Sequence, residues 1–301
     1  MSRIVWPQRA FRLVQSLVLA GIIVYLSVRA ATIMFGPVGG WSAVLLVSVI
    51  SLRSLGTQRL FLPSGSFRLQ WSDAPDLYRT VRTLSERGGL SSPPQVYVLP
   101  SPEPQAMTTG TGPGATILVT RGLLELLSFR ELRGVIAHEI AHIVNRDLPL
   151  FAVLGAMQML TRFVATTLMA IVLFAFPMLL MGLPVVDPEA LLYLSFVPIV
   201  SLLLQPAFLR TREFQADLRA AELTEDPDAL ASALVKIEGV RRSLWQRWLT
   251  RGPVAGDDLL SRLLNTHPGT GERVRRLQEL RKAAYGLRRP TPVIAGPRRR
   301  W

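Results

Sequence analysis

The sequence predicts a mainly α integral membrane protein with four transmembrane helices and a polar α+β part that contains a small β-sheet. Three observations lead to this fold class. Hydrophobic residues make up 49% of the 301 residues, and the mean hydropathy is +0.31. Charged residues make up only 18%, whereas a soluble domain usually carries about 25%. Long uncharged apolar runs occur in two pairs, and each pair is followed by a polar stretch.

The apolar runs are long enough to cross a bilayer, which takes about 20 mostly apolar residues. They predict spans at about 12–35, 38–55, 150–182 and 189–208. Gly36-Pro37 separates the first pair, and Asp187-Pro188 turns the second. A cleaved signal peptide is the alternative for the first run, but that run is long and another follows at once. A buried hairpin in a soluble core is the alternative for the second pair, and its length argues against this.

Arginines flank the runs on one side. They precede the first span at Arg3, Arg9 and Arg12, follow the second at Arg53 and Arg59, and follow the fourth at Arg210 and Arg212. Because positive residues stay on the cytoplasmic side, both termini and both polar arms are expected there.

The charge balance and the lack of cysteine limit the partners and metal ligands. The formal net charge of +13 suits nucleic acid or an anionic lipid surface. The high apolar content favours lipid, and no nucleic-acid partner is expected. The sequence has no cysteine, which excludes disulfides and thiolate metal sites. Its three histidines are His138, His142 and His267.

The spans divide the chain into five parts. These are the N-terminal segment with two spans (1–55), a first polar arm (56–147), two further spans (148–209), a second polar arm (210–285) and a basic tail (286–301). The tail has five arginines, three prolines and no acidic residue. We expect it to be disordered and attracted to anionic lipid.

The first arm reads as a small sheet followed by helices. Short β-rich runs predict strands at 95–99, 106–109 and 115–120, with a glycine-rich turn at 110–114. A helix then begins near Arg121. Ser128 and Glu131 have the spacing of a capping box, which predicts the start of a helix over about 129–146. The second arm reads as helices at about 227–243, 258–265 and 269–285.

The capped helix carries the residues that indicate chemistry, His138-Glu139-Ile140-Ala141-His142. Histidines four apart lie on one helical face, so both rings can reach one ion. The spacing fits a zinc site of two histidines and a carboxylate with a position left for water. Glu139 lies beside that face and can take a proton from the water and return it to the leaving amine. The alternative is two structural histidines that are four apart by chance.

A third ligand has to come from a distant segment, because no histidine follows within twelve residues. Glu213 and Asp217 are four apart and share one helical face. Glu213 would bind the zinc ion, and Asp217 would accept a hydrogen bond from the distal nitrogen of His138. The two spans between His142 and Glu213 return the chain to the same side, so both can share one ion. A solvated helix face is the alternative for this segment.

Four stretches together resemble the HtpX family of membrane zinc metalloproteases, which is related to the prenyl-protein endopeptidases. They are residues 119–128, 131–147, 212–217 and 266–273, and the resemblance covers about residues 10–285.

The resemblance implies a gluzincin-type endopeptidase with a cytoplasmic metalloprotease domain in a bacterial-type inner membrane. It implies protein or peptide substrates, chiefly membrane proteins, and a role in quality control and stress response. His138, His142 and Glu213 match the family's ligands of one zinc ion, and Glu139 matches its catalytic base. The family's Asn-Ala-Phe is here Gln105-Ala106-Met107, which leaves substrate positioning open.

Two possible substrate contacts stay open at this stage. An extended substrate could add to the sheet edge near Gln105, Ala106 and Met107, or this could be an ordinary edge. His267 could hydrogen-bond the oxyanion, as a catalytic residue, or only cap the helix after Pro268. The alternative functions are a signalling protease that cleaves one dedicated regulator and a non-catalytic zinc or lipid-binding scaffold.

Overall fold

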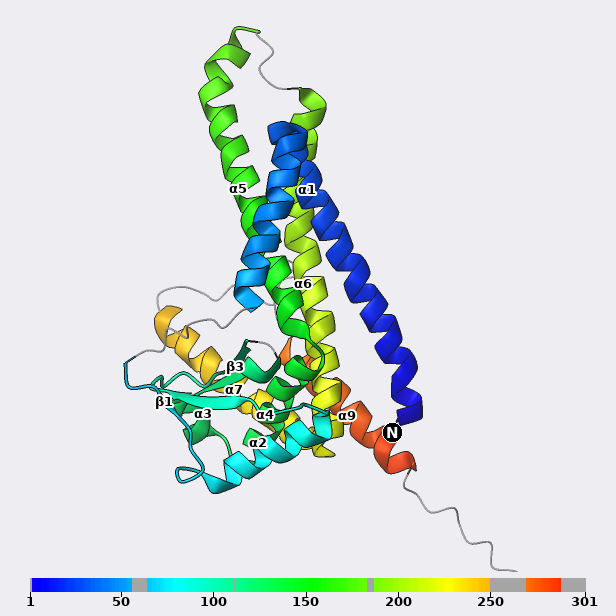
Figure 1. The fold of residues 1–301 in the computed structure, drawn as a ribbon, viewed down its shortest axis with the longest axis vertical. Coiled ribbons are helices and arrows are strands. Elements are labelled where there is room, and N and C mark those ends of the chain that lie inside the picture. The colour runs from blue at the N-terminus through cyan, green and yellow to red at the C-terminus, as the bar shows by residue number, and fades with distance from the viewer. Residues whose placement is uncertain (1, 56–63, 111, 183–186, 250–268, 288–301) are drawn as a thin grey trace, which may run out of the picture.

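A computed structural model describes residues 2–55, 64–110, 112–182, 187–249 and 269–287. Long helices form a tall bundle, and a small sheet with shorter helices lies at one end of it (Figure 1). The expected helix at 258–265, His267 and the tail from residue 288 lie outside the described residues.

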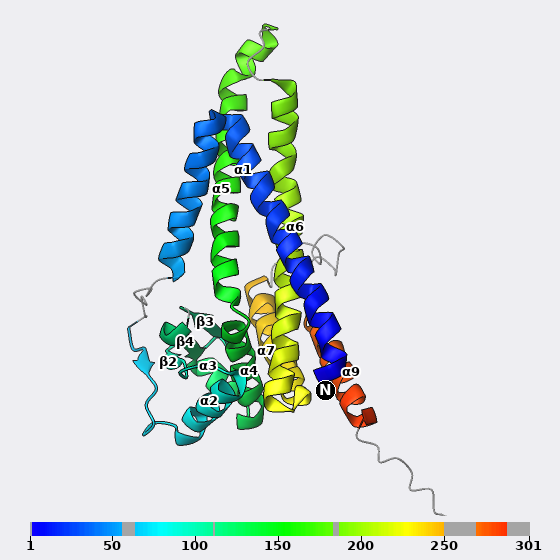
Figure 2. The same cartoon turned by 45° about the vertical axis from the view of Figure 1, so that its right-hand side comes forward.

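Three helices in the described part are long and apolar enough to cross a membrane. They are α1 (Ser2–Leu55), α5 (Asp147–Leu180) and α6 (Pro188–Thr224), with apolar stretches within Val14–Leu46, Asp147–Met178 and Glu189–Thr224. The protein is therefore a multi-pass membrane protein. Helix α1 folds back on itself at Gly36, where φ is 73° (Figures 1 and 2). Glycine favours this left-handed conformation, so the break expected at Gly36-Pro37 is where the chain reverses.

Helix α6 is longer than the expected span at 189–208, because it continues without interruption to Thr224. Its 37 residues correspond to a length of about 55 Å. The polar stretch after Leu209 is rich in arginine, glutamate, glutamine, alanine and leucine, which all favour helix. The boundary expected at residue 209 therefore falls inside one helix, which carries Glu213 and Asp217 out of the bundle.

The sheet has the strand order β1-β2-β4-β3. The strands are β1 (Phe67–Arg68), β2 (Gln95–Leu99), β3 (Ala106–Thr109) and β4 (Thr116–Thr120). Strands β2 and β4 are parallel, and the other two pairs are antiparallel. The expected strands are confirmed, with β4 one residue shorter than expected. Strand β1 was not expected, because two exposed residues carry no alternating pattern. Strand β3 is an edge strand, so one of its sides has no strand neighbour among the residues that the structure describes.

The core of this part lies between the sheet and the helices α2 (Pro75–Gly88) and α4 (Phe129–Val144). Every residue of β4 is buried, and α3 (Arg121–Leu126) follows it directly. Helix α2 was not expected from the sequence. The shared core includes Val96, Val98, Ile117, Val119, Leu77, Leu84, Ile136 and Ile140. Packing against this core fixes α4, the helix that carries the two histidines.

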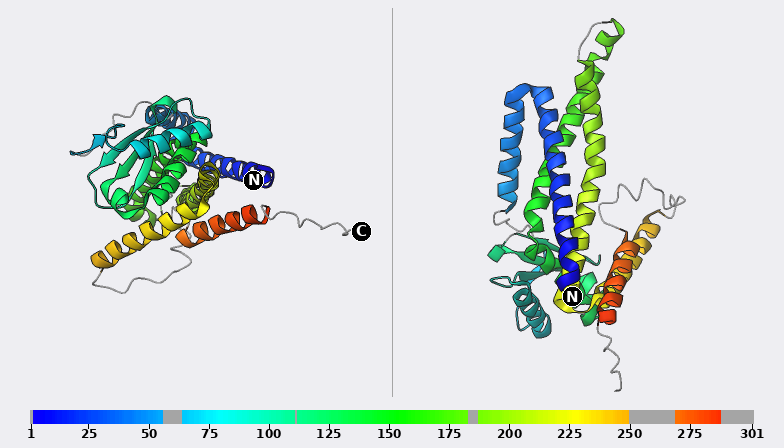
Figure 3. Two further views of the ribbon diagram at one scale, coloured as in Figure 1. Left: turned by 90° about the horizontal axis from the view of Figure 1, so that it is seen from below. Right: turned by 90° about the vertical axis from the view of Figure 1, so that its right-hand side faces the viewer.

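Helix α4 is capped as expected and is held against α7 (Pro227–Leu249). Ser128 and Glu131 form the reciprocal capping box. Glu131 also accepts hydrogen bonds from Ser232, at 2.6 Å, and from Lys236, at 2.7 Å. A Cβ atom at Gly134 would lie 2.8 Å from the backbone nitrogen of Leu230, so glycine permits the close approach of the two helices. Helix α9 (Thr270–Leu287) lies alongside α7 (Figure 3).

We expect Glu131 to make this contact between α4 and α7 sensitive to acid. Burial raises the pKa of Glu131, but hydrogen bonds from Lys236, Ser232 and Ser128 outweigh it and lower the pKa from 4.5 to about 2. The stability that this carboxylate contributes is present above pH 4.5 and is lost as the pH falls toward 2. Melting in EDTA between pH 6 and 3 should therefore show a shallower decline for Glu131→Gln than for the wild type.

The matched control is Glu86→Gln, because Glu86 forms only an exposed pair with Arg82. This variant should follow the wild-type pH dependence. Equal slopes for wild type and Glu131→Gln would contradict a stabilising role for the ionised carboxylate.

Candidate active site

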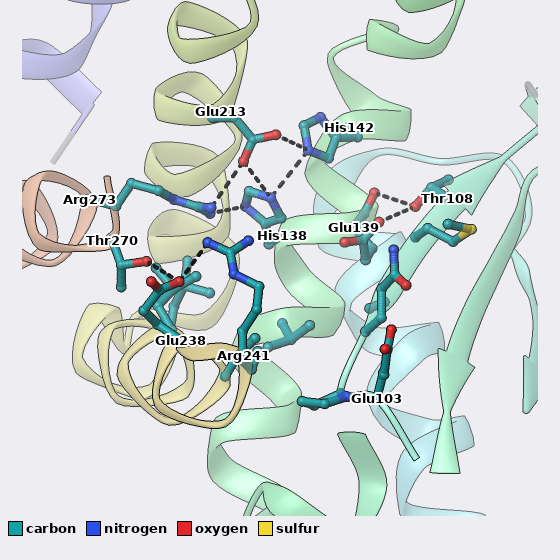
Figure 4. A pocket seen from close by; sticks show the side chains of 18 of the residues that line it. Glu103, Thr108, His138, Glu139, His142, Glu213, Glu238, Arg241, Thr270 and Arg273 are labelled. Carbon is teal, nitrogen blue, oxygen red and sulfur yellow. Dashed lines mark hydrogen bonds and ion pairs between the residues drawn. The ribbon is translucent and has the colours of Figure 1, made fainter. Parts of the chain in front are cut away.

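Helix α4 places the two expected histidines side by side. The Nε2 atoms of His138 and His142 lie 3.2 Å apart, and both side chains are buried. Their spacing of four residues puts the rings on one face of the helix. Both rings point to the same place, beside α6 (Figure 4).

Helix α6 brings Glu213 to this place. Its Oε2 lies 3.6 Å from Nε2 of His138, and its Oε1 lies 3.7 Å from Nε2 of His142. One donor atom from each of the three residues lies within 4.8 Å of the others. The structure thus brings together three residues that lie up to 75 positions apart in the sequence (213 minus 138).

Glu139 points from the same helix turn toward the edge strand. The hydroxyl of Thr108 on β3 donates a hydrogen bond to Oε2 of Glu139 at 2.7 Å (Figure 4). Glu139 is buried and lies beside the three converging donors. Thr108 therefore connects the sheet edge to the carboxylate that the sequence indicates as a base.

The distal nitrogen of His138 contacts Asp217. Nδ1 of His138 lies 3.0 Å from Oδ1 of Asp217. Arg273 on α9 donates to both oxygens of Asp217, at 2.8 and 2.6 Å, and its Nη1 lies 3.1 Å from Oε2 of Glu213. Arg273 is buried, so this two-pronged pairing satisfies a charge that is largely withdrawn from water.

The comparisons with known proteins identify the family. The model of peptidase family M48 matches residues 72–281, which include every residue of the site described above. The chain belongs to peptidase family M48. Protease HtpX homologs are similar over most of the chain. The Aquifex aeolicus protein is 32% identical and covers 81% of this chain and 86% of its own length. The Acaryochloris marina protein is 34% identical, and the match covers 91% of this chain and 95% of that protein.

A solved structure also resembles this M48 peptidase. The crystal structure of S. mikatae Ste24p has a TM-score of 0.53 and 21% sequence identity. The match covers 91% of this chain and 66% of the Ste24p chain. The likeness shows a shared fold. The protein is thus a zinc-dependent membrane endopeptidase of the HtpX type.

The converging donors of this M48 peptidase fit zinc. Two imidazole nitrogens and one carboxylate oxygen are a common ligand set of catalytic zinc, whereas magnesium and calcium prefer oxygen ligands alone. Without a metal ion, burial lowers the pKa of His138, but the contact with Asp217 and the nearby carboxylate of Glu213 outweigh it and raise the pKa to about 10. Zinc has to displace that proton, so zinc affinity is expected to fall as the pH is lowered.

A cavity of about 900 Å³ opens over the converging donors. One wall is the edge strand with the loop before it, where the expected substrate contacts Gln105, Ala106 and Met107 lie. The other wall is α7, and the first turns of α5 close one side. Beyond the edge strand and its loop, the apolar lining consists of Val135, Leu148, Phe151, Leu230, Leu234 and Ile237.

Sequence reasoning missed four residues that contact the candidate site. Thr108 donates a hydrogen bond to Glu139, and Arg273 pairs with Asp217 and Glu213. Asp147 contacts His142, and Arg212 donates a hydrogen bond to Asp147. Spacing could have indicated Asp147, which follows His142 by five residues. Thr108, Arg212 and Arg273 each contact a residue of a different helix or strand, so tertiary packing decides their partners.

Proposed function

We propose that this M48 peptidase cleaves extended, apolar segments of membrane proteins beside the cytoplasmic face of a bacterial inner membrane, as part of quality control. The observation that carries this proposal is the position of the cavity. Leu148 and Phe151, from the first turns of the membrane helix α5, line it, and the rings of His142 and Phe151 lie 5.7 Å apart. A substrate in the cavity would therefore lie close to the bilayer.

The proposed topology has four crossings. The two arms of α1 on either side of Gly36 would provide two, and α5 and α6 would provide the others. An even number places both termini and the cavity on one side of the membrane. The arginines near the ends of the apolar runs favour the cytoplasmic side.

The proposed chemistry assigns a role to each residue of the site. His138, His142 and Glu213 would hold one zinc ion, which supplies a water of lowered pKa and polarises the scissile carbonyl. Glu139 would take the proton from the attacking water and pass it to the leaving amine. The hydrogen bond from Thr108 to Oε2 holds this carboxylate and leaves Oε1 for the proton.

The proposed substrate is an extended chain added to the outer edge of β3, the side away from β4. Main-chain hydrogen bonds to an edge strand would hold a peptide without selecting its sequence. Leu230, Leu234 and Ile237 face the edge strand across the cavity and would receive apolar side chains. Such side chains are abundant in misfolded membrane proteins. The basic tail is proposed to bind anionic lipid, and no nucleic-acid partner is proposed.

Thr108 gives a test of how Glu139 is held. Thr108→Val has nearly the same shape but lacks the donor, so we expect kcat to fall about 10-fold, the value of one hydrogen bond to a charged group. Thr108→Ser keeps the hydroxyl and should retain most of the activity. Peptide hydrolysis by purified variants checks this, and equal losses in both variants would rule out the hydrogen bond as the cause.

The proposed function is tested in proteoliposomes. The peptidase is reconstituted with a destabilised model membrane protein, and its cleavage products are mapped by mass spectrometry. We expect cuts in apolar stretches near the bilayer surface, and no cuts with Glu139→Gln. If casein is cleaved while the membrane protein in the same vesicles stays intact, the proposed substrate class is wrong.

A further inference from the structure

His142 is held at its distal nitrogen by the first residue of a membrane helix. Nδ1 of His142 lies 2.7 Å from Oδ2 of Asp147, and Asp147 is completely buried. Asp147 begins α5, whose apolar stretch starts at the same residue. The orientation of this ring therefore depends on where the membrane helix begins.

The other oxygen of Asp147 is held by α6, which forms a membrane hairpin with α5. Nε and Nη2 of Arg212 both donate to Oδ1 of Asp147, and Nη2 also donates to the carbonyl of Asn145 at 3.1 Å. Arg212 is 1% exposed and immediately precedes Glu213 on α6. We call this pair the Asp147–Arg212 clamp. It joins α4, α5 and α6 beside two of the proposed zinc ligands, His142 on α4 and Glu213 on α6.

The backbone between α4 and α5 is bent to make this contact. Arg146 has a φ of 54°, a left-handed conformation that is uncommon for a side chain of this kind. It turns the chain so that Asp147 lies under His142. A buried ion pair often adds little net stability, because desolvation offsets the attraction. Its placement beside a ligand histidine points to a role in geometry.

We propose that Asp147 and Arg212 are positioning residues of the metal centre. Asp147 fixes the ring of His142, and Arg212 locks α6 to α5 beside Glu213, so both ligands approach the ion correctly. This inference rests on the proposed ligand roles of His142 and Glu213. The distal nitrogen of His138 has a different carboxylate partner, Asp217 on α6, which Arg273 on α9 holds in turn, so Asp147 orients His142 and not His138.

Metal binding, measured without reference to activity, tests the clamp. Zinc affinity is determined by chelator competition on the full-length protein, and the absorption spectrum is recorded with cobalt in place of zinc. Loss of a group that orients a ligand histidine typically weakens metal affinity about 10- to 100-fold. We expect this loss, with a changed cobalt spectrum, in both Asp147→Asn and Arg212→Gln. Because each substitution breaks the same Asp147–Arg212 contact, the double variant should bind zinc no more weakly than the weaker-binding single variant.

The control is Asp226→Asn. Asp226 forms a two-pronged pair with Arg130, at 2.6 and 2.7 Å, that does not contact the metal ligands. It should retain wild-type zinc affinity. A second variant, Arg212→Lys, keeps the buried charge but cannot donate two hydrogen bonds to Asp147 from one planar group. It replaces Arg212→Gln in the test if that variant does not fold. We expect it to weaken zinc binding as well.

Two outcomes separate failure of this inference from failure of the proposed site. If Asp147→Asn and Arg212→Lys melt earlier but bind zinc as tightly as Asp226→Asn, the clamp is only structural and the inference is overturned. If Glu213→Gln keeps wild-type zinc affinity, the proposed ligand set is wrong, and the inference that rests on it falls too.

Discussion

Replacing Glu139 by glutamine is expected to abolish peptide hydrolysis while zinc stays bound. Glutamine has nearly the same shape and can still accept the hydrogen bond from Thr108, but its amide cannot take a proton from water. A positioned general base contributes about 10²–10⁴-fold to the rate. Casein cleavage should therefore fall by at least about 100-fold, while metal analysis finds as much zinc as in the wild type.

The matched control for this prediction is Glu125→Gln, because Glu125 is an exposed residue of α3. It should cleave casein at the wild-type rate. A Glu139→Gln protein that is active would reject Glu139 as the base. An inactive protein without zinc would show instead that Glu139 supports the metal site.

Replacing Glu213 by alanine is expected to remove both the metal and the activity. Two histidines would remain as protein donors, and catalytic zinc sites normally have three. The change also leaves Arg273 without one of its two carboxylate partners in a buried position. We expect zinc affinity to fall by more than the roughly 100-fold typical of lost supporting contacts. Metal content after gel filtration, measured beside casein cleavage, checks this.

The comparison with Glu139→Gln makes the second prediction specific. Both variants should be inactive, but only Glu213→Ala should lose zinc. Circular dichroism should show wild-type helix content in both, since α6 is held by packing along its length. If Glu213→Ala binds zinc stoichiometrically and cleaves casein, another residue is the third ligand.

Local spacing predicted much of the site. Residues four apart share a helical face, so His138 with His142 and Glu213 with Asp217 could be paired from the sequence. The apolar hairpin between them explained how the two pairs could meet. The sequence also contains a pattern that predicts helix α2. Leu77, Val81 and Leu84 have helical spacing and are buried, and they follow Pro75, a residue that is favoured in the first turn of a helix.

Tertiary packing decided the rest. Thr108 contacts a residue 31 positions away, Arg212 one 65 positions away and Arg273 one 56 positions away. No periodicity connects such residues, and arginines near the ends of membrane spans are readily explained by the lipid interface. The continuity of α6 with the expected span at 189–208 was also not predicted, because the loss of hydrophobicity after Leu209 does not show whether a helix ends there.

The unbroken course of α6 limits how this enzyme can be simplified for laboratory work. A water-soluble form would omit the membrane helices and join a first part that ends with α4 to a second part that starts after residue 209. The second part would begin three residues before Glu213, in a first helical turn, where backbone amides lack intrahelical partners and the chain frays. The first part would lack Asp147. Inhibitor screening and crystallisation therefore require the intact polypeptide in detergent or nanodiscs.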